Sequence, residues 1–393
     1  MSVTDFVNQY GVDRRHTNSL KWDALDERFG DATLTPLWVA DMEFREPASV
    51  TDAIIERVRH GVFGYAIDDP AYFDAFNNWQ QTRHNLSLER RWLTFDNGVV
   101  NSLYTIVNTF TKPDDAVMVL TPVYYPFKNA VTDNHRTLIT SELKHDQDTF
   151  TIDFADVEAK IVANDVRVLI HCSPHNPIGR IWTPKELEQL LSICARHNVL
   201  VVSDEIHQDF EIGDCKFVSA LTVADGRYND HLIVLNAPSK SFNMATLLNS
   251  HVIIPNATLQ TQFLAGQKCF NQVELSVLGQ TAGEAAYRTA GDWFDELVAV
   301  IRSNYQYVRD ELAVKAPAVH VANLEGTYLL WLDLRSVVDP TTIHEFVQNK
   351  VGLAVDYGEW FSDEDQGCIR LNLATKPEFV HAAVQQLLTA LVH

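Results

Sequence analysis

Short, continuous apolar runs recur along this chain, separated by segments long enough to hold helices. Such runs are typical of buried parallel strands, because helices cover both faces of the sheet and leave no polar face along the strand. The pattern predicts an α/β fold with a large, doubly wound, mostly parallel sheet and right-handed connections. The predicted strands span residues 116–120, 166–170, 198–202, 231–235 and 250–254.

Four of these runs are followed closely by a polar or aromatic side chain. These side chains belong to Tyr124, Asn176, Asp204 and Lys240. Ligands bind outside the carboxyl ends of the strands in an open parallel sheet, so we expect all four to converge in one crevice. Taken singly, each has a simpler interpretation, as a solvated surface lysine or a turn residue. Their recurrence after four separate strands favours a functional site.

The four groups together suit pyridoxal 5'-phosphate (PLP). A lysine can form a Schiff base with its aldehyde, and a carboxylate can pair with its pyridinium nitrogen. An amide can hydrogen-bond the ring oxygen, and an aromatic ring can stack on the cofactor. The sequence therefore predicts a PLP site that contains Lys240, Asp204, Asn176 and Tyr124.

Two helices are indicated by clear local signals. Apolar residues at helical spacing predict a helix over residues 97–111 that begins at Asn97-Gly98. Its first N–H groups would face the crevice and suit a phosphate, although a capped core helix is an equally good interpretation of this segment alone. The second helix begins with the capping box Thr183-Pro184-Lys185-Glu186 and runs to about residue 197.

The pattern changes after about residue 285. An amphipathic segment over 292–314 precedes two strand-like segments at 328–333 and 368–373 and a helix at about 377–391. We interpret this part as a smaller α+β domain that the N-terminal segment joins. The predicted organisation is a large cofactor-binding domain at 46–285 and a small domain formed by 1–45 and 286–393.

Composition narrows the function classes. The 393 residues carry a net charge of −21, which opposes binding to nucleic acid or to an anionic membrane surface. Neither a leader pattern nor a run of roughly 20 apolar residues is present, so we expect neither secretion nor membrane insertion. The five cysteines are scattered and the fifteen histidines form no ligand pattern. We expect a cytoplasmic protein without metal that acts on small molecules.

The ordered motifs resemble the fold type I aminotransferase superfamily of PLP enzymes, specifically its carbon–sulfur lyase branch related to cystathionine β-lyase. The resemblance covers nearly the whole chain. Two of its motifs are Cys172-Ser173-Pro174-His175-Asn176-Pro177-Ile178-Gly179-Arg180 and Ala237-Pro238-Ser239-Lys240-Ser241-Phe242-Asn243. The others lie at 13–23, 37–42, 60–65, 122–127 and 202–207. The resemblance implies a homodimer with shared active sites.

The resemblance also implies roles for individual residues. Lys240, Asp204 and Tyr124 would be catalytic, with Lys240 bonded to PLP. Further cofactor contacts would come from Gly98, Val99, Val100, Asn176, His207, Ser239 and, from the neighbouring subunit, Tyr65. The amino-acid substrate would contact Arg370, Asn176 and Ala40, and the planar fork of Arg370 suits an α-carboxylate. A structural salt bridge is the other interpretation of Arg370.

Two positions depart from the patterns of related enzymes. Many aminotransferases of this fold carry an arginine eight residues after the lysine, where this chain has Leu248. Lyase-branch members commonly show Ala-Gly-Leu where this chain has Ala245-Thr246-Leu247, and a β-branched residue in place of glycine could tighten the backbone. The first departure agrees with the lyase branch.

The implied reaction is β-elimination from L-cystathionine or a related L-cysteine conjugate, giving a thiol, pyruvate and ammonia. Transamination is the alternative, because both reactions use the same residues. A non-catalytic PLP-fold regulator or binding protein is a second alternative, which the presence of Lys240, Asp204, Asn176 and Arg370 disfavours.

Overall fold

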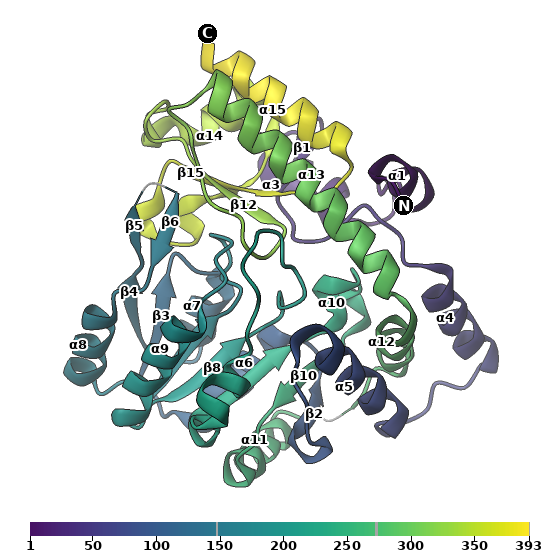
Figure 1. The fold of residues 1–393 in the computed structure, drawn as a ribbon, viewed down its shortest axis with the longest axis vertical. Helices are drawn as coiled ribbons and strands as arrows, with labels where there is room; N and C mark the ends of the chain where they lie inside the picture. The colour runs from purple at the N-terminus through teal and green to yellow at the C-terminus, as the bar shows by residue number, and fades with distance from the viewer. Residues whose placement is uncertain (147, 272–273, 393) are drawn as a thin grey trace.

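The computed structural model describes residues 1–146, 148–271 and 274–392. Its largest sheet has seven strands and is doubly wound, and Figure 1 shows this sheet in the lower part of the molecule with helices on both sides. In their order across the sheet, the strands are β2 (Leu93–Asp96), β10 (Ser250–Ile253), β9 (Leu232–Asn236), β8 (Leu200–Asp204), β7 (Val168–Cys172), β3 (Ala116–Thr121) and β4 (Thr137–Glu142).

The predicted α/β class and mostly parallel sheet are confirmed. Parallel pairing joins β4, β3, β7, β8 and β9. The 250–254 run is the exception to the parallel expectation, because β10 pairs antiparallel with both neighbours. The connection from β9 holds only α10 (Pro238–Ser241) and the short turn η4 (Ala245–Leu247), so the chain re-enters the sheet from the end at which it left.

Both faces of the central strands are apolar, as the continuous runs require. On β3, Val117 and Val119 pack on one side and Met118 and Leu120 on the other. The first side is covered by α6 (Val99–Phe110), α7 (Tyr125–Thr132) and α11 (Ala257–Cys269). The second is covered by α5 (Pro70–His84), α8 (Phe154–Asn164), α9 (Pro184–Arg196) and α12 (Val277–Thr289).

The start signals of two helices have the expected outcomes. The capping box of α9 is formed by Thr183 and Glu186, as predicted. Helix α6 begins at Val99, one residue after Gly98.

Strands β7 and β8 begin two residues later than predicted, so Asp204 is the last residue of β8 instead of lying beyond it. The apolar residues before these strands are buried in the connections, which is why the apolar run alone misplaced the boundary.

A second, four-stranded sheet is formed mostly by the C-terminal third of the chain. Its strands are β11 (His320–Val321), β12 (Leu329–Asp333), β15 (Cys368–Asn372) and β14 (Asp356–Tyr357). The long helices α13 (Gly291–Lys315) and α15 (Pro377–Val392) pack together beside it in the upper part of Figure 1. These elements match the predicted amphipathic segment, strands and final helix.

The N-terminal segment reaches this second sheet. Its short strand β1 (Thr35–Pro36) pairs in parallel with β13 (Leu353–Ala354), and helix α1 (Val3–Tyr10) packs against α13. Figure 1 shows α1 beside α13 and far from the carboxyl-terminal end of α15. Residues after β1 then pass toward the edge of the large sheet where Lys240 lies. Among the described helices, none is long and apolar enough to cross a membrane.

Candidate active site

A cavity of about 190 Å³ lies at the carboxyl ends of the parallel strands. It collects most of the predicted site residues, namely Ala40, Gly98, Val99, Val100, Tyr124, Asn176, Asp204, His207, Ser239 and Lys240. Phe127, Cys172, Ile206 and Ala245 complete the lining and were not predicted as site residues. The first three lie within or beside the motifs around 122–127, 172–180 and 202–207, so the sequence carried a signal for them. The convergence expected from four separate strand ends is therefore present.

Lys240 is held beside the cavity by a backbone carbonyl. It lies in α10, directly after β9, and its Nζ donates to the Ala40 carbonyl at 2.9 Å. Burial lowers the pKa of Lys240 to about 8, although the negative charge of Asp41 opposes that shift. The positive charge of Arg370 lowers this pKa further. An appreciable fraction of the amine is therefore neutral near neutral pH, as a nucleophile or a base requires.

Asp204 and His207 are two polar residues of the cavity lining. Burial raises the pKa of Asp204 to about 7, while the Ile206 N–H, which donates to Asp204 Oδ1 at 3.0 Å, and the charge of Lys240 oppose that shift. Burial lowers the pKa of His207 well below its usual range, and its Nδ1 is buried without a hydrogen-bond partner among the described residues. A cation beside Asp204 would restore its charged form.

Arg370 is not among the residues that line the cavity, but it contacts Asn176, which is, and a carboxylate. Its Nη1 donates to Asn176 Oδ1 at 2.7 Å, and its Nη2 forms a short ion pair with Asp356. Arg370 is only 3 % exposed and its Nε has no partner among the described residues. Both interpretations of Arg370 thus find support, since it is salt-bridged and still has a free donor. Asp356 lies on the two-residue strand β14, and no sequence signal pointed to it.

The start of α6, which was predicted to hold a phosphate, lines the cavity. The first N–H groups of any helix lack acceptors within the helix, and here they belong to Val99 and Val100. Gly98 before them has φ +146°, and an added Cβ would meet nothing within 4 Å. That backbone conformation favours glycine and leaves open space next to the helix start.

The two departures near Lys240 have different outcomes. Leu248 is 52 % exposed and is not among the cavity-lining residues, so it supplies nothing to a phosphate. Thr246 is exposed within η4 and its φ is not positive. The backbone at Thr246 therefore does not need the freedom of glycine, and the expected tightening is absent.

Tyr65 does not reach the cavity of its own chain. It lies in the extended segment after α4 (Ala48–His60) and is 99 % exposed. Its predicted role, from the neighbouring subunit, stays a prediction. No group of three or more His, Cys, Asp or Glu side chains that could hold a metal occurs within residues 1–146, 148–271 and 274–392.

The cavity residues fit the polar groups of PLP. Because Asn176 Oδ1 accepts from Arg370, the Asn176 NH₂ remains as a donor, which a ring oxygen requires. The Lys240 amine suits the aldehyde, and the Asp204 carboxylate suits the pyridine nitrogen. The helix start at Val99 suits a phosphate. The partly buried Tyr124 offers an aromatic ring in the same cavity.

This chain belongs to the aminotransferase class I and II family, whose pattern matches residues 43–387. It is 36 % identical over 361 residues to cystathionine beta-lyase PatB of Bacillus subtilis (strain 168), covering 92 % of this chain and 93 % of that protein. The crystal structure of cystalysin from Treponema denticola, which contains a pyridoxal 5'-phosphate cofactor, superposes with a TM-score of 0.93 at 32 % identity. The match covers 97 % of each chain.

The PLP-bound C-S lyase from Staphylococcus hominis gives a TM-score of 0.91 at 30 % identity, again over 97 % of each chain. These findings confirm the family resemblance and the fold type that the ordered motifs implied.

Proposed function

We propose that this protein is a PLP-dependent carbon–sulfur β-lyase that cleaves L-cystathionine or a related L-cysteine conjugate to a thiol, pyruvate and ammonia. The observation that carries the proposal is the cavity in which the Lys240 amine, the Asp204 carboxylate and the Asn176 amide meet, with Arg370 bonded to Asn176. The similarity to cystathionine beta-lyase PatB and to the C-S lyase from Staphylococcus hominis supports this reaction.

Lys240 would act as the base. When bound, PLP withdraws electrons from the substrate Cα, so that the Cα–H bond and then the Cβ–S bond can break. Lys240 would supply the neutral amine that takes the Cα proton. The electron pair left at Cα forms the bond to Cβ while sulfur departs as a thiolate. The remaining three-carbon fragment takes up water and leaves as pyruvate and ammonia.

The other cavity residues would bind and orient. Asp204 would hold the protonated pyridine nitrogen of PLP, and Tyr124 would pack against its ring. The start of α6 and the Ser239 hydroxyl would hold its phosphate. Arg370 would bind the substrate α-carboxylate through its remaining donors, including the unpartnered Nε.

Transamination is the second candidate, favoured by the description of the matching family as aminotransferases. It would use the same Lys240 amine as base, with the substrate amino group passed on to a 2-oxo acid and the Cβ–S bond left intact. The named residues serve both reactions, so product analysis must distinguish them.

The test is incubation of the PLP-loaded protein with L-cystathionine, with and without a 2-oxo acid. We expect pyruvate, ammonia and a free thiol in equal amounts without the 2-oxo acid. Lys240→Ala is the inactive control, and Lys185→Ala, at an exposed lysine of α9, is the matched active one. Turnover that depends strictly on the 2-oxo acid, with no thiol released, would establish transamination instead.

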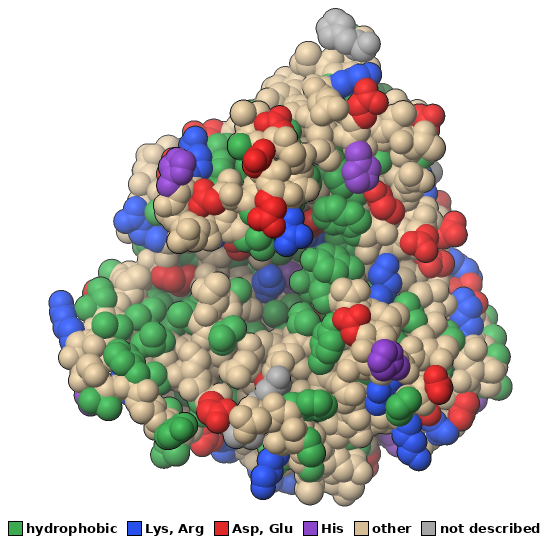
Figure 2. All heavy atoms as spheres, turned by 180° about the vertical axis from the view of Figure 1, so that it is seen from behind, with side chains coloured by type: hydrophobic (Ala, Val, Ile, Leu, Met, Phe, Trp, Pro, Cys, Tyr) green, Lys and Arg blue, Asp and Glu red, His purple; other side chains and the backbone are tan. Residues whose placement is uncertain are grey.

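We further propose that the active unit is a homodimer, the commonest soluble assembly. The support is a run of exposed apolar side chains in α4 and the segment after it, namely Ile55, Val58, Val62, Phe63, Tyr65 and Ile67. Exposed apolar clusters of this kind mark interaction surfaces. Figure 2 shows hydrophobic side chains gathered on the back face, on both sides of a hollow between the upper and lower parts of the molecule. A neighbouring chain on this surface would bring Tyr65 toward the partner's phosphate end.

A further inference from the structure

The residues before and after Ala40 form a short segment whose backbone is fixed by buried side chains. We define Val39–Met42 as the strap. Its Ala40 carbonyl accepts two hydrogen bonds, from Lys240 Nζ at 2.9 Å and from the Tyr328 hydroxyl at 2.9 Å. The position of the Lys240 amine therefore depends on where this carbonyl lies.

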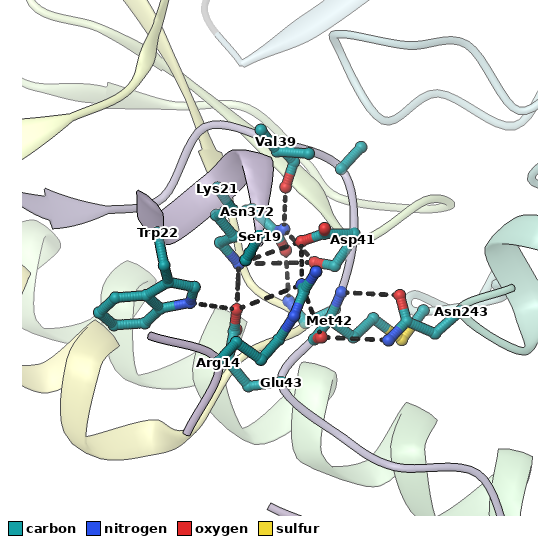
Figure 3. Close-up of polar contacts among 12 residues, drawn as sticks. Arg14, Ser19, Lys21, Trp22, Val39, Asp41, Met42, Glu43, Asn243 and Asn372 are labelled. Carbon is teal, nitrogen blue, oxygen red and sulfur yellow. Dashed lines mark hydrogen bonds and ion pairs between the residues drawn. The ribbon is translucent and has the colours of Figure 1, made fainter. Parts of the chain in front are cut away.

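One end of the strap is held from the small sheet. Asn372, the last residue of β15, is fully buried, and its Nδ2 donates to the Val39 carbonyl at 2.6 Å and to the Asp41 carbonyl at 2.7 Å. One side chain thus binds the carbonyls of the two residues that flank Ala40. Figure 3 shows Asn372 between Val39 and Asp41.

The other end is held from the loop that carries Lys240. Asn243 accepts from the Met42 N–H at 3.0 Å and donates to the Met42 carbonyl at 3.1 Å. The Asn243 side chain thus bonds to both backbone groups of Met42, as a residue of a neighbouring antiparallel strand would, and Figure 3 shows both bonds. Asn243 lies three residues after Lys240, so the loop grips the strap twice, at Ala40 and at Met42.

Ion pairs from the N-terminal segment also hold the strap and Glu43, the residue after it. Lys21 and Glu43 are both fully buried and pair at 2.9 Å, while Trp22 Nε1 donates to Glu43 at 3.0 Å. Arg14 pairs with Asp41 at 2.7 Å and also donates to the Met42 carbonyl. The buried Lys21–Glu43 pair resists displacement, because breaking it leaves an uncompensated buried charge.

We infer that Asn372 and Asn243 are positioning residues for the reaction, which act by clamping the strap so that the Ala40 carbonyl holds the Lys240 amine at the reacting carbon. This rests on the proposed function, in which Lys240 is the base. A catalytic base must lie at a defined position relative to the proton that it removes. Displacing it by about 1 Å can lower the rate by about 100-fold. The strap supplies that place through a single backbone oxygen.

The test compares four variants of the PLP-loaded enzyme: Asn372→Ala, Asn243→Gly, both together, and the control Asn304→Ala. Asn304 is also fully buried, and its Nδ2 also donates to two carbonyls, those of Leu373 and Thr375 at 2.9 Å each, but it does not touch the strap. Glycine is chosen at position 243 because φ is +50° there. Asn243 is only partly buried, so Asn243→Gly carries the test should Asn372→Ala not fold.

We expect kcat to fall by about 10- to 100-fold in each strap variant, with KM close to the wild-type value. The double variant should lose little more than either single one, because both residues act on one segment. Asn304→Ala should lower Tm and leave kcat unchanged.

A second measurement is independent of turnover. The rate at which added PLP bonds to Lys240 in the cofactor-free protein is followed against pH. A weaker contact with the Ala40 carbonyl disfavours the charged amine, so the midpoint of this profile should move to lower pH in the strap variants. Asp204, Arg370 and His207 also act electrostatically on Lys240, and all three lie outside the strap. Asp41 raises the pKa of Lys240 and lies within the strap, so its displacement would move the midpoint in the same direction, to lower pH.

Failure of the inference and failure of the proposed function give different results. If wild-type protein does not bond PLP at Lys240, the proposed function fails. If wild-type protein behaves as proposed but both strap variants match Asn304→Ala in kcat and in pH midpoint, the clamp is only structural and the inference is overturned.

Discussion

Asp356 and Arg370 lie directly opposite each other on the antiparallel strands β14 and β15, and their side chains form a buried ion pair. The same guanidinium group donates to Asn176 in the candidate active site. Arg370 therefore already holds a carboxylate when no substrate is bound. Burial raises the pKa of Asp356 above its ordinary value, against the effect of Arg370, so a second carboxylate would favour its protonation.

Asp356→Asn should tighten substrate binding. The substitution keeps the shape of the side chain and removes the charge that opposes the substrate α-carboxylate at Arg370. We expect KM for L-cystathionine to fall by about tenfold, equivalent to about 1.4 kcal/mol, and Tm to fall. The control is Asp333→Asn, which breaks the Asp333–Arg335 pair in the same sheet and should change only Tm. A raised KM would mean that Asp356 orients Arg370 for the substrate.

Asp204→Asn should stabilise the cofactor-free protein while abolishing turnover. Burial raises the folded-state pKa of Asp204 to about 7, so the neutral carboxyl does not destabilise the fold at low pH. As pH rises through about 7 the buried carboxyl becomes charged, and the wild-type protein loses stability relative to the variant. The gain in Tm should therefore be larger at pH 8 than at pH 5. Since one pKa unit corresponds to about 1.4 kcal/mol, the gain in the free energy of unfolding should reach a few kcal/mol at pH 8.

Asp365→Asn is the matched control for that prediction. Burial also raises the pKa of Asp365 to about 7, but Asp365 does not line the cavity. It should show the same pH-dependent gain in Tm with turnover retained. Equal Tm values for wild type and Asp204→Asn at pH 8 would contradict a buried, costly carboxylate at position 204.

Lys240→Ala should remove the covalent bond to PLP and lower turnover by about 10,000-fold, the upper range for loss of a positioned base. Borohydride reduction of the loaded wild-type protein, followed by peptide mapping, should place the cofactor on Lys240. Reduction onto another lysine would refute the assignment of the site.

Tyr65→Phe should weaken retention of PLP by about 1.5–3 kcal/mol, because it removes one hydrogen bond to a charged group. The sharper experiment mixes inactive Tyr65→Ala with inactive Lys240→Ala while subunits exchange. A hybrid dimer has one site with both defects and one with neither, so activity should partly return. Demonstrated hybrids without activity would mean that Tyr65 serves its own chain or only packs.

The sequence predicted the parts of the site that follow from strand order. Tyr124, Asn176, Asp204 and Lys240 could be placed together because parallel strands deliver their carboxyl ends to one edge. The direction of β10 could not be predicted, since apolar periodicity carries no information on strand direction. Asp356 was missed because β14 has only two residues and shows no pattern. The division at residues 46 and 285 stays a prediction.

The strap was also beyond the reach of the sequence. Ala40, Lys240 and Asn372 are far apart in the chain, and their contact depends on how the small sheet packs against the large one. Asn243 lies in the same motif as Lys240, yet nothing in the local sequence indicates that its amide bonds to Met42.

The clamp at Asn372 has a consequence for protein synthesis. Lys240 and the parallel strands of the large sheet emerge from the ribosome well before Asn372 and before β13, to which the N-terminal strand β1 pairs. Until Asn372 has been made, the Val39 and Asp41 carbonyls lack the side chain that binds them both. A chain that ends before β15 would therefore carry the lysine with only part of the clamp that positions its amine.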